Sequence, residues 1–454
     1  MAPPSFPIQQ KQSRPDESRM QILIIGAGLA GLGTSIACLL AGHDVHLLEA
    51  THEIREVGAG IQVLPNSSRV LQHWGLAHAL TPHMTVPRQC NFLTWKGHRI
   101  SSLDFADSER QFPGTWYRDF HRADLQRCLL DRAVELGAEV TCAARVVDIV
   151  VSQEGSRATA VASDGRRWTA DLVVSADGVF GKLTEVMLGR PDPPIRTGDL
   201  AYRLLLSTEE MRKDPELRPF VTDPQVNYWL GPDQHAVNYV LRNGELFNMV
   251  LLVPDDIPEE SLASTVEGNV EEMCALFEGW DPRIQKLLRL CQSVHKWRLC
   301  IRFGDYDWTH PSGAWVMLGD AVHATLPYLA SGAGMSFEDG AVLGECLSRL
   351  PTDISKTCPD FLSAKRHALA VFEQCRKQRT QMVVERGNLQ QHYYHLHDGE
   401  EQQERDRKMQ MVPTPEGEAL AWRDPGLAPK LLGYDHVADV DANWDTVGEK
   451  LARL

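Results

Sequence analysis

A glycine-rich turn near the N-terminus constrains the fold of this chain more than any other segment. Residues 21–25 (QILII) have the continuous apolar character of a buried parallel strand, and residues 29–42 show helical spacing. Between them lies GAGLAG, residues 26–31, and a second apolar strand, residues 44–49, follows. This order of strand, turn, helix and strand predicts a βαβ unit and therefore a doubly wound, Rossmann-type parallel sheet.

The glycines of this turn have the spacing that a dinucleotide site requires. Gly26 permits the tight turn, Gly28 lets the backbone approach a pyrophosphate, and Gly31 lets the helix pack closely on the strand. The first turn of the helix then offers free N–H groups to the phosphates. Glu49 ends the second strand, where its carboxylate can accept hydrogen bonds from a ribose. The motif predicts a bound dinucleotide and leaves FAD and NAD open.

Two later segments favour FAD. The apolar strand DLVVS is followed by Asp177 and Gly178, and the strand AWVMLG is followed by Asp320. Each aspartate ends an apolar strand, at the edge where ligands bind in such sheets. Asp320 can accept hydrogen bonds from a ribityl chain. The helix that begins after Gly332 can direct its positive end towards an anionic reduced flavin.

The rest of the chain predicts a substrate domain inserted into the cofactor domain. Residues 200–254 change to β-rich, alternating segments that are typical of an antiparallel sheet. After it, the apolar segment 314–320 is again typical of a buried parallel strand, and the chain ends in helical segments. We therefore expect a disordered polar tail at residues 1–19 and an FAD-binding domain in two parts, at residues 20–195 and 296–350. The β-sheet substrate domain is expected at residues 196–295, and a C-terminal helical region at residues 351–454.

Composition excludes several other classes of function. The formal net charge of −15 argues against nucleic acid as a partner, because phosphate binding needs a basic surface. No apolar run reaches the length of a membrane helix, so we expect a cytoplasmic protein without a membrane partner. The ten cysteines contain no CxxC pair, and we expect reduced thiols. The histidines between residues 392 and 397 lack a completing ligand, so no metal site is expected. The sequence does not indicate the oligomeric state.

Together these motifs resemble the flavoprotein aromatic hydroxylases of the salicylate and p-hydroxybenzoate hydroxylase type. The resemblance extends over about residues 20–395 and rests on GAGLAGL with Glu49, GAGIQVLPN, HRADL, ADG and LGDAVH…PYLASGAGMSFEDGAVLG. It is nearest to fungal monooxygenases that tailor phenolic polyketides in secondary metabolism. The resemblance implies that FAD is held from pyrophosphate to isoalloxazine by Gly26, Gly28, Gly31, Glu49, Gly60, Gln62, Arg122, Asp177, Gly178, Asp320 and Ala333.

The resemblance also implies a reaction. NADPH or NADH reduces FAD, molecular oxygen forms a flavin C4a-hydroperoxide, and a small phenolic substrate is hydroxylated ortho to its phenolate. Arg203 would hold the phenolate and Tyr239 would hydrogen-bond the same oxygen. Each is a polar side chain that alternates with apolar residues, in AYRLLL and in HAVNYVL, as expected where a strand borders a pocket.

Some alternatives stay open at this point. After ADG the family usually continues with a serine and an arginine, where this chain has Gly181 and Thr184, so the nicotinamide contacts differ. The same fold could serve a flavin oxidase or dehydrogenase that needs no external nicotinamide. It could also serve a non-enzymatic binding protein. The exact substrate, and whether hydroxylation is decarboxylative, simple or dearomatising, cannot be read from the sequence.

Overall fold

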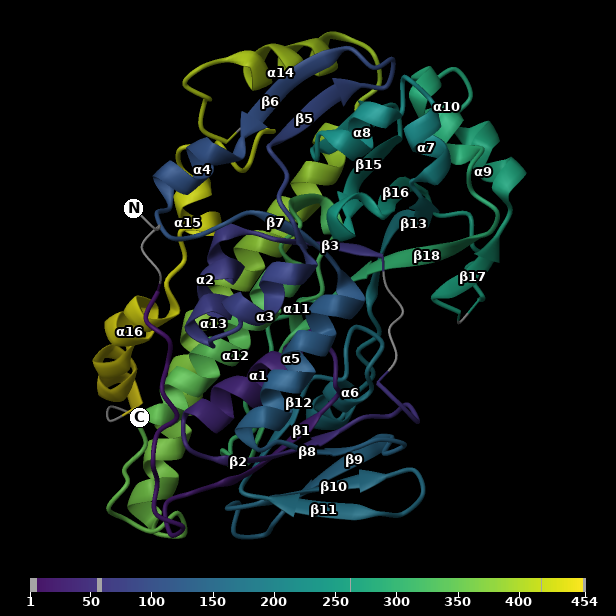
Figure 1. Cartoon of the computed structure of the whole chain (residues 1–454). Coiled ribbons are helices and arrows are strands. Elements are labelled where there is room, and N and C mark those ends of the chain that lie inside the picture. Colours follow the sequence, from purple (N-terminus) through teal and green to yellow (C-terminus); the bar gives the residue numbers. More distant parts are fainter. Residues whose placement is uncertain (1–5, 55–58, 262, 418, 452–454) are drawn as a thin grey trace.

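The cofactor half of the molecule is built on a parallel sheet. The structure is a computed structural model that describes residues 6–54, 59–261, 263–417 and 419–451. Five parallel strands lie in the order β19-β12-β1-β2-β8, in the lower half of Figure 1. They are β1 (Gln21–Ile25), β2 (Asp44–Leu48), β8 (Glu139–Thr141), β12 (Leu172–Ser175) and β19 (Trp315–Met317). The doubly wound parallel sheet expected from the sequence is confirmed.

Both faces of this sheet are covered, which explains why β1 is apolar at every position after the first. Ile22 and Ile24 pack into a core with the helices, whereas Leu23 and Ile25 pack against a small antiparallel sheet. The helices on the first face are α1 (Leu29–Leu40), α5 (Arg122–Leu136), α12 (Gly332–Ser348), α13 (Pro359–Tyr394) and α16 (His436–Leu451). The small sheet on the second face contains β9 (Val146–Val151), β10 (Ala158–Ala162) and β11 (Arg167–Ala170).

The other half is an eight-stranded sheet, in the upper part of Figure 1. Its order is β17-β18-β13-β16-β15-β14-β5-β6, and all neighbours are antiparallel except β14 and β5. The strands are β5 (Gln89–Thr94), β6 (Arg99–Asp104), β13 (Ile195–Ser207), β14 (Val226–Gly231), β15 (Gln234–Leu241), β16 (Leu246–Pro254), β17 (Thr265–Gly268) and β18 (Val294–Ile301). The sheet is therefore larger than the domain placed at 196–295, because β5 and β6 come from the preceding cofactor segment.

The two faces of the large sheet have different neighbours. Alternation sends Tyr228 and Tyr239 to an inner face and Trp229 to an outer face, where it packs in a separate apolar core. Four short helices border the outer face, namely α7 (Glu209–Lys213), α8 (Arg218–Thr222), α9 (Val270–Leu276) and α10 (Pro282–Leu288). The inner face is turned towards the cofactor half.

The remaining elements connect the two halves or extend the C-terminus. Helix α14 (Glu400–Gln410), which is rich in charged residues, lies over β5 and β6 in Figure 1. A third, small sheet joins β3 (Gly60–Val63), β7 (Arg118–His121) and β4 (Met84–Thr85). The other elements are α2 (Pro65–His73), α3 (Ala77–Leu80), η1 (Thr81–His83), α4 (Phe105–Gln111), α6 (Leu183–Leu188), η2 (Arg242–Gly244), α11 (Asp320–His323), η3 (Pro327–Leu329), α14 (Glu400–Gln410) and α15 (Ala428–Leu432).

The N-terminal segment corrects one expectation. Residues 1–5 lie outside the described residues, but residues 6–19 are packed on the protein rather than forming a disordered tail. Arg14 is only 3% exposed, and its guanidinium donates to the carbonyls of Ala41 at 2.8 Å and Ser348 at 2.7 Å. These carbonyls belong to the C-terminal ends of α1 and α12, which need donors. A single arginine therefore caps two helices. The polar composition of this segment gave no sign of that role.

Candidate active site

A cavity of about 320 Å³ lies between the cofactor half and the inner face of the large sheet. Its walls come from the starts of α1 and α12, from β3, and from β13, β15 and β16. Most of the residues that the sequence predicted for the site line this cavity, namely Gly28, Gly60, Gln62, Arg122, Gly178, Arg203, Tyr239, Asp320 and Ala333.

The glycine turn at the start of α1 has the close packing that its spacing predicted. Gly26 has a φ of 104°, and a side chain there would clash with the backbone of Ala176, directly after the neighbouring strand β12. A side chain at Gly31 would clash with the carbonyl of Gly26. At Gly28, by contrast, no atom lies within 4 Å of the position of a Cβ. Gly26 and Gly31 therefore shape the turn, and Gly28 keeps open the space before the helix.

Both helices that point at the cavity begin without a side-chain cap. Gly28 is the N-cap of α1, and Ser331, the N-cap of α12, donates its hydroxyl to the carbonyl of Leu329 instead. The first N–H groups of both helices are therefore left for a ligand. An N-terminus with free N–H groups favours an anion, such as a pyrophosphate or an anionic flavin ring.

Two acidic residues support the turn without lining the cavity. The Glu49 carboxylate accepts hydrogen bonds from the backbone N–H of Ala27 at 2.9 Å and of Thr51 at 2.8 Å. Asp177 accepts from the N–H of Leu183 at 3.1 Å, and its burial raises its pKa. Its neighbour Gly178, rather than the Asp177 side chain, lines the cavity.

Gly181 and Thr184, which stand where the family usually has a serine and an arginine after Asp177-Gly178, both have packing contacts. A Cβ at Gly181 would overlap the present position of the Asp177 carboxylate, so a side chain there would require Asp177 to move. Thr184 is buried, and its hydroxyl donates to the carbonyl of Ala321 at 3.1 Å. Helix α6, which follows β12, is thus tied to helix α11, which follows β19.

Asp320 is exposed at the start of α11 and lines the cavity. The turn that carries it is fixed from behind by Asp339 of α12. That carboxylate accepts from the N–H of Gly319 at 2.8 Å and lies 2.5 Å from Nε2 of His323. His323 and Asp339 together therefore hold this turn in place.

Arg203 and Tyr239 both reach the cavity from the large sheet. Among the described residues, no carboxylate forms an ion pair with Arg203, and its buried Nε has no hydrogen-bond partner. Burial lowers the pKa of Arg203, the nearby Arg122 guanidinium lowers it further, and Tyr239 raises it. Burial raises the pKa of Tyr239, and Arg203 opposes that effect. Two cations without a counter-ion create a positive potential that favours an anionic ligand.

The comparisons with known proteins identify the family. A family model described as "FAD binding domain" matches residues 19–245. FAD-dependent monooxygenase OpS4 of Beauveria bassiana is 38% identical over 93% of this chain and 97% of its own length. The chain belongs to the FAD-dependent aromatic hydroxylases. A 3-amino-4-hydroxybenzoate 2-monooxygenase of Streptomyces cremeus is 32% identical over 89% of this hydroxylase and 94% of its own length.

Solved structures show the same fold. The substrate complex of a salicylate hydroxylase aligns with 94% of this hydroxylase and 98% of its own chain, with a TM-score of 0.74 at 20% identity. A complex of CtdE with FAD and a substrate aligns over 96% and 100%, with a TM-score of 0.79 at 20% identity.

The residues of this hydroxylase fit bound FAD. The open space at Gly28 and the uncapped start of α1 suit the pyrophosphate, and the uncapped start of α12 suits the pyrimidine edge of the flavin ring. Arg122 has a backbone bond to Ala59, whereas its side chain forms no ion pair within the described part of the chain and lines the cavity. Bound flavin supplies the oxygen-activating chemistry. The residues named above would hold the flavin in place.

Sequence reasoning missed several residues of the cavity wall. His235 and Tyr328 line it, as do Tyr228, Val250 and Leu252. His235 could have been found, because it alternates with Val237 and Tyr239 on the same strand face. Asn248 of β16 was also missed. Its side-chain oxygen accepts from the N–H of Gly60 at 2.7 Å and so ties β3 to the large sheet.

Gly60 limits the position of Tyr239, which gives a first prediction. A Cβ at Gly60 would lie 2.6 Å from the Tyr239 hydroxyl oxygen, so alanine there must displace the phenol ring. We expect Gly60→Ala to lower kcat by about 10-fold, because a small misplacement of a positioned group is costly. Steady-state turnover with a saturating phenol measures this. If the effect passes through Tyr239, Gly60→Ala should cause little further loss in a Tyr239→Phe background; a full additional loss would contradict the explanation.

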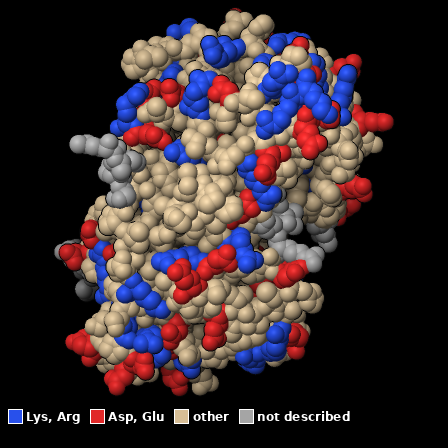
Figure 2. Space-filling model, viewed as in Figure 1, with Lys and Arg blue, Asp and Glu red and all other residues tan. Residues whose placement is uncertain are grey.

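A second cavity, of about 380 Å³, opens on the outer face of the large sheet. Its lining includes Arg88, Arg99 and Arg283, and none of the predicted site residues. In Figure 2 lysine and arginine gather over this part, at the upper right, while acidic and basic side chains are mixed elsewhere on that face.

Among the described residues, no three histidine, cysteine or acidic side chains are grouped as metal ligands. No helix in the described ranges is long and apolar enough to span a bilayer.

Proposed function

We propose that this hydroxylase inserts one oxygen atom into a small phenolic ring, ortho to a phenolate that Arg203 holds. The observation that carries the proposal is the uncompensated Arg203 guanidinium on the cavity wall, beside the Tyr239 hydroxyl. A phenolate is the ligand that such a pair suits, because the cation stabilises the charge and the hydroxyl donates a hydrogen bond. The ionised phenol is more electron-rich than the neutral phenol, which favours attack on an electrophilic oxygen.

The cavity wall supports the proposed substrate class. Apart from Arg203, Arg122 and the polar tips of Tyr239, Tyr228 and His235, the sheet side of the cavity is apolar, with Val237, Val250 and Leu252. Such a wall suits an aromatic ring with a few polar substituents. Salicylate-like acids and resorcinol-type polyketides both have this character. The hydroxybenzoate named for the Streptomyces relative and the fungal origin of OpS4 support a role in secondary metabolism.

NADPH or NADH is the proposed reductant. The described residues show one glycine-rich dinucleotide turn, at the start of α1, and it is assigned to FAD. A nicotinamide would therefore bind transiently near the loop of Gly178, reduce the flavin and leave. An oxidase without external nicotinamide is the competing mode. It would consume oxygen with the phenol alone and release peroxide in equal amount.

Product analysis tests the proposal. Purified holoenzyme is incubated with a panel of phenolic acids and aldehydes, with NADPH or NADH, and products are identified by mass spectrometry. We expect gain of one oxygen ortho to a phenolic oxygen, with loss of carbon dioxide where a carboxyl occupies that position. The matched control omits nicotinamide. Peroxide release from phenol without nicotinamide, and no oxygenated product with it, would reject the proposal in favour of the oxidase mode.

A further inference from the structure

We propose that Trp297 is a positioning residue, which holds the Arg203 guanidinium against its aromatic face and leaves the positive charge free for the substrate. This inference rests on the proposed function, because it concerns how the phenolate site keeps its cation in place. A carboxylate would also fix an arginine, but it would neutralise the charge that a phenolate needs. An aromatic ring attracts a cation without cancelling that charge.

Trp297 lies beside Arg203 because of the register of two neighbouring strands. Arg203 of β13 is opposite His295 of β18, and Ala201 is opposite Trp297. Trp297 is therefore the diagonal neighbour of Arg203 on the inner face, within reach of a long side chain. The guanidinium carbon of Arg203 lies 5.2 Å from the centre of the Trp297 ring, inside the range of a cation–π contact.

Packing holds the Trp297 ring in place. The residue is half-buried and packs against the inner apolar core, which includes Ala201 and Leu299. On its other side, Thr265 of the strand β17 is its partner in the sheet. A tryptophan side chain has only two rotatable dihedral angles, so it is a rigid support. The ring can therefore fix one face of the guanidinium.

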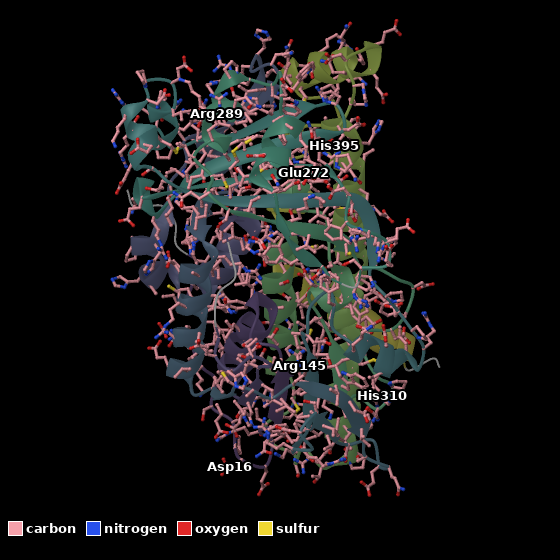
Figure 3. The ribbon with its side chains drawn as sticks, turned by 90° about the vertical axis from the view of Figure 1, so that its right-hand side faces the viewer. Asp16, Arg145, Glu272, Arg289, His310 and His395 are labelled. Carbon is pink, nitrogen blue, oxygen red and sulfur yellow. The ribbon has the colours of Figure 1, made fainter. Side chains whose placement is uncertain are left out.

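The neighbouring cations of the same strand have their charges compensated. Lys296 and Arg298 flank Trp297 in sequence and therefore point to the outer face of the sheet. Nζ of Lys296 lies 2.9 Å from Oε1 of Glu272, a residue of α9 that is labelled in Figure 3. Nε of Arg298 lies 2.6 Å from Oδ2 of Asp255. An arginine that faces the cavity is thus held differently from the cations that face away from it.

Hydrogen bonds within the protein hold other polar groups of the cavity wall. Nδ1 of His235 lies 2.8 Å from Nε2 of His395, which follows helix α13 and is labelled in Figure 3. The Tyr328 hydroxyl donates to Asp199. Among the described residues, Arg203 has no such partner for its Nε, and no acidic group acts on its pKa. The aromatic contact is therefore what orients its guanidinium.

The contact matters because Arg203 faces a second cation. Arg122 also lines the cavity, and its charge lowers the pKa of Arg203. Repulsion between the two guanidinium groups favours movement of Arg203 away from the cavity. The Trp297 ring opposes this movement, so the positive potential stays at the cavity wall. Loss of the ring should weaken binding of a phenolate more than binding of the neutral phenol.

The first test measures the ionisation of a bound phenol in the oxidised holoenzyme, where no oxygen is transferred. The probe is 2,4-dihydroxybenzaldehyde, and its phenolate absorption is followed through a pH titration. We expect Trp297→Leu to raise the pKa of the bound probe by about one pH unit, a 10-fold loss of affinity for the phenolate relative to the phenol. Trp297→Phe, which keeps an aromatic face, should recover part of this loss.

Trp168→Leu is the matched control. Trp168 lies on β11, in the small sheet of the cofactor half, and the guanidinium carbon of Arg166 is 5.2 Å from its ring. This variant loses the same kind of contact away from the cavity, so the pKa of the bound probe should stay as in the wild type. Bound flavin, measured from its absorption, should remain in both leucine variants.

A double-mutant cycle gives a readout that needs no substrate. Denaturant unfolding is measured for the wild type, Trp297→Leu, Arg203→Met and the double variant. If the ring holds the guanidinium, the double variant should change the unfolding equilibrium constant by about 3- to 10-fold less than the product of the single effects. If Trp297 only fills space in the core, the two effects should multiply.

The outcomes separate this inference from the proposed function. An unchanged pKa of the probe in Trp297→Leu, with effects that multiply in the cycle, would overturn the positioning role and leave the proposed function standing. A probe that stays protonated on the wild-type enzyme throughout the titration would reject the phenolate mechanism, and the role of Trp297 in it, even if the cycle showed coupling.

Discussion

Replacing Arg203 with methionine is expected to lower kcat/KM for a phenolic substrate by about 100- to 1000-fold, the usual effect of removing one charge-stabilising donor. The pKa of the bound phenol should rise by about one to three pH units, because the guanidinium no longer stabilises the phenolate. Steady-state kinetics and an absorption titration of the bound phenol measure the two effects. Bound flavin should remain, since Arg203 lies on the sheet side of the cavity.

The same substitution should not weaken the fold. Arg203 is a buried cation with no ion pair in the described part of the chain, and its guanidinium carbon is 5.2 Å from the centre of the Trp297 ring. Removing an uncompensated buried charge is neutral or stabilising by about 1 kcal/mol. Arg196→Met, an exposed position on the same strand, is the matched control. A large loss of thermal stability in Arg203→Met would mean that Arg203 has a structural role.

The glycine turn gives the second large effect. Gly31→Ala is expected to yield a protein without flavin that is destabilised by about 3 kcal/mol, because overpacking against backbone cannot be relieved by a rotamer change. The clash is with the Gly26 carbonyl, inside the turn itself. Thermal unfolding and the flavin absorption spectrum measure the two losses.

Gly28→Ala is the matched comparison for that variant. Its backbone has a φ of −71°, which alanine adopts, and a Cβ there meets no protein atom within 4 Å. The fold without cofactor should therefore be as stable as wild type. FAD affinity should fall about 100-fold, or about 2.7 kcal/mol, because the methyl group occupies the space of the pyrophosphate. Wild-type affinity in Gly28→Ala would place the pyrophosphate elsewhere.

The cofactor half could be predicted because its signals are local. The apolar strand, the glycine spacing and the acid at the end of the next strand all lie within residues 21–49, and together they predict one local structure, the βαβ unit. Arg203 and Tyr239 were predicted from the family resemblance, and their alternation with apolar residues agreed with a strand that borders a pocket. Asp177 was predicted to lie near the cofactor. Its carboxylate accepts from the N–H of Leu183 and packs against Gly181, and these contacts are not visible as a pattern along the chain.

The rest depends on residues far apart in sequence. His235 and His395 are separated by 160 positions, and nothing near His395 shows that the end of α13 returns to β15. Arg14 looked like part of a polar tail because its partners, the ends of α1 and α12, meet only in the folded protein. The strands β5 and β6 were assigned to the wrong half for the same reason, since parallel pairing of β5 with β14 is a long-range contact.

That interleaving has a consequence for how specificity can change in these proteins. The chain enters the large sheet as β5 and β6, leaves it, and returns as β13 to β18, so no single stretch encodes the substrate wall. A chimera that exchanges only 196–295 with a relative would pair foreign strands with a native β5. New substrate ranges should therefore be sought by point changes at inward-facing positions such as Val237 and Val250, and not by module exchange.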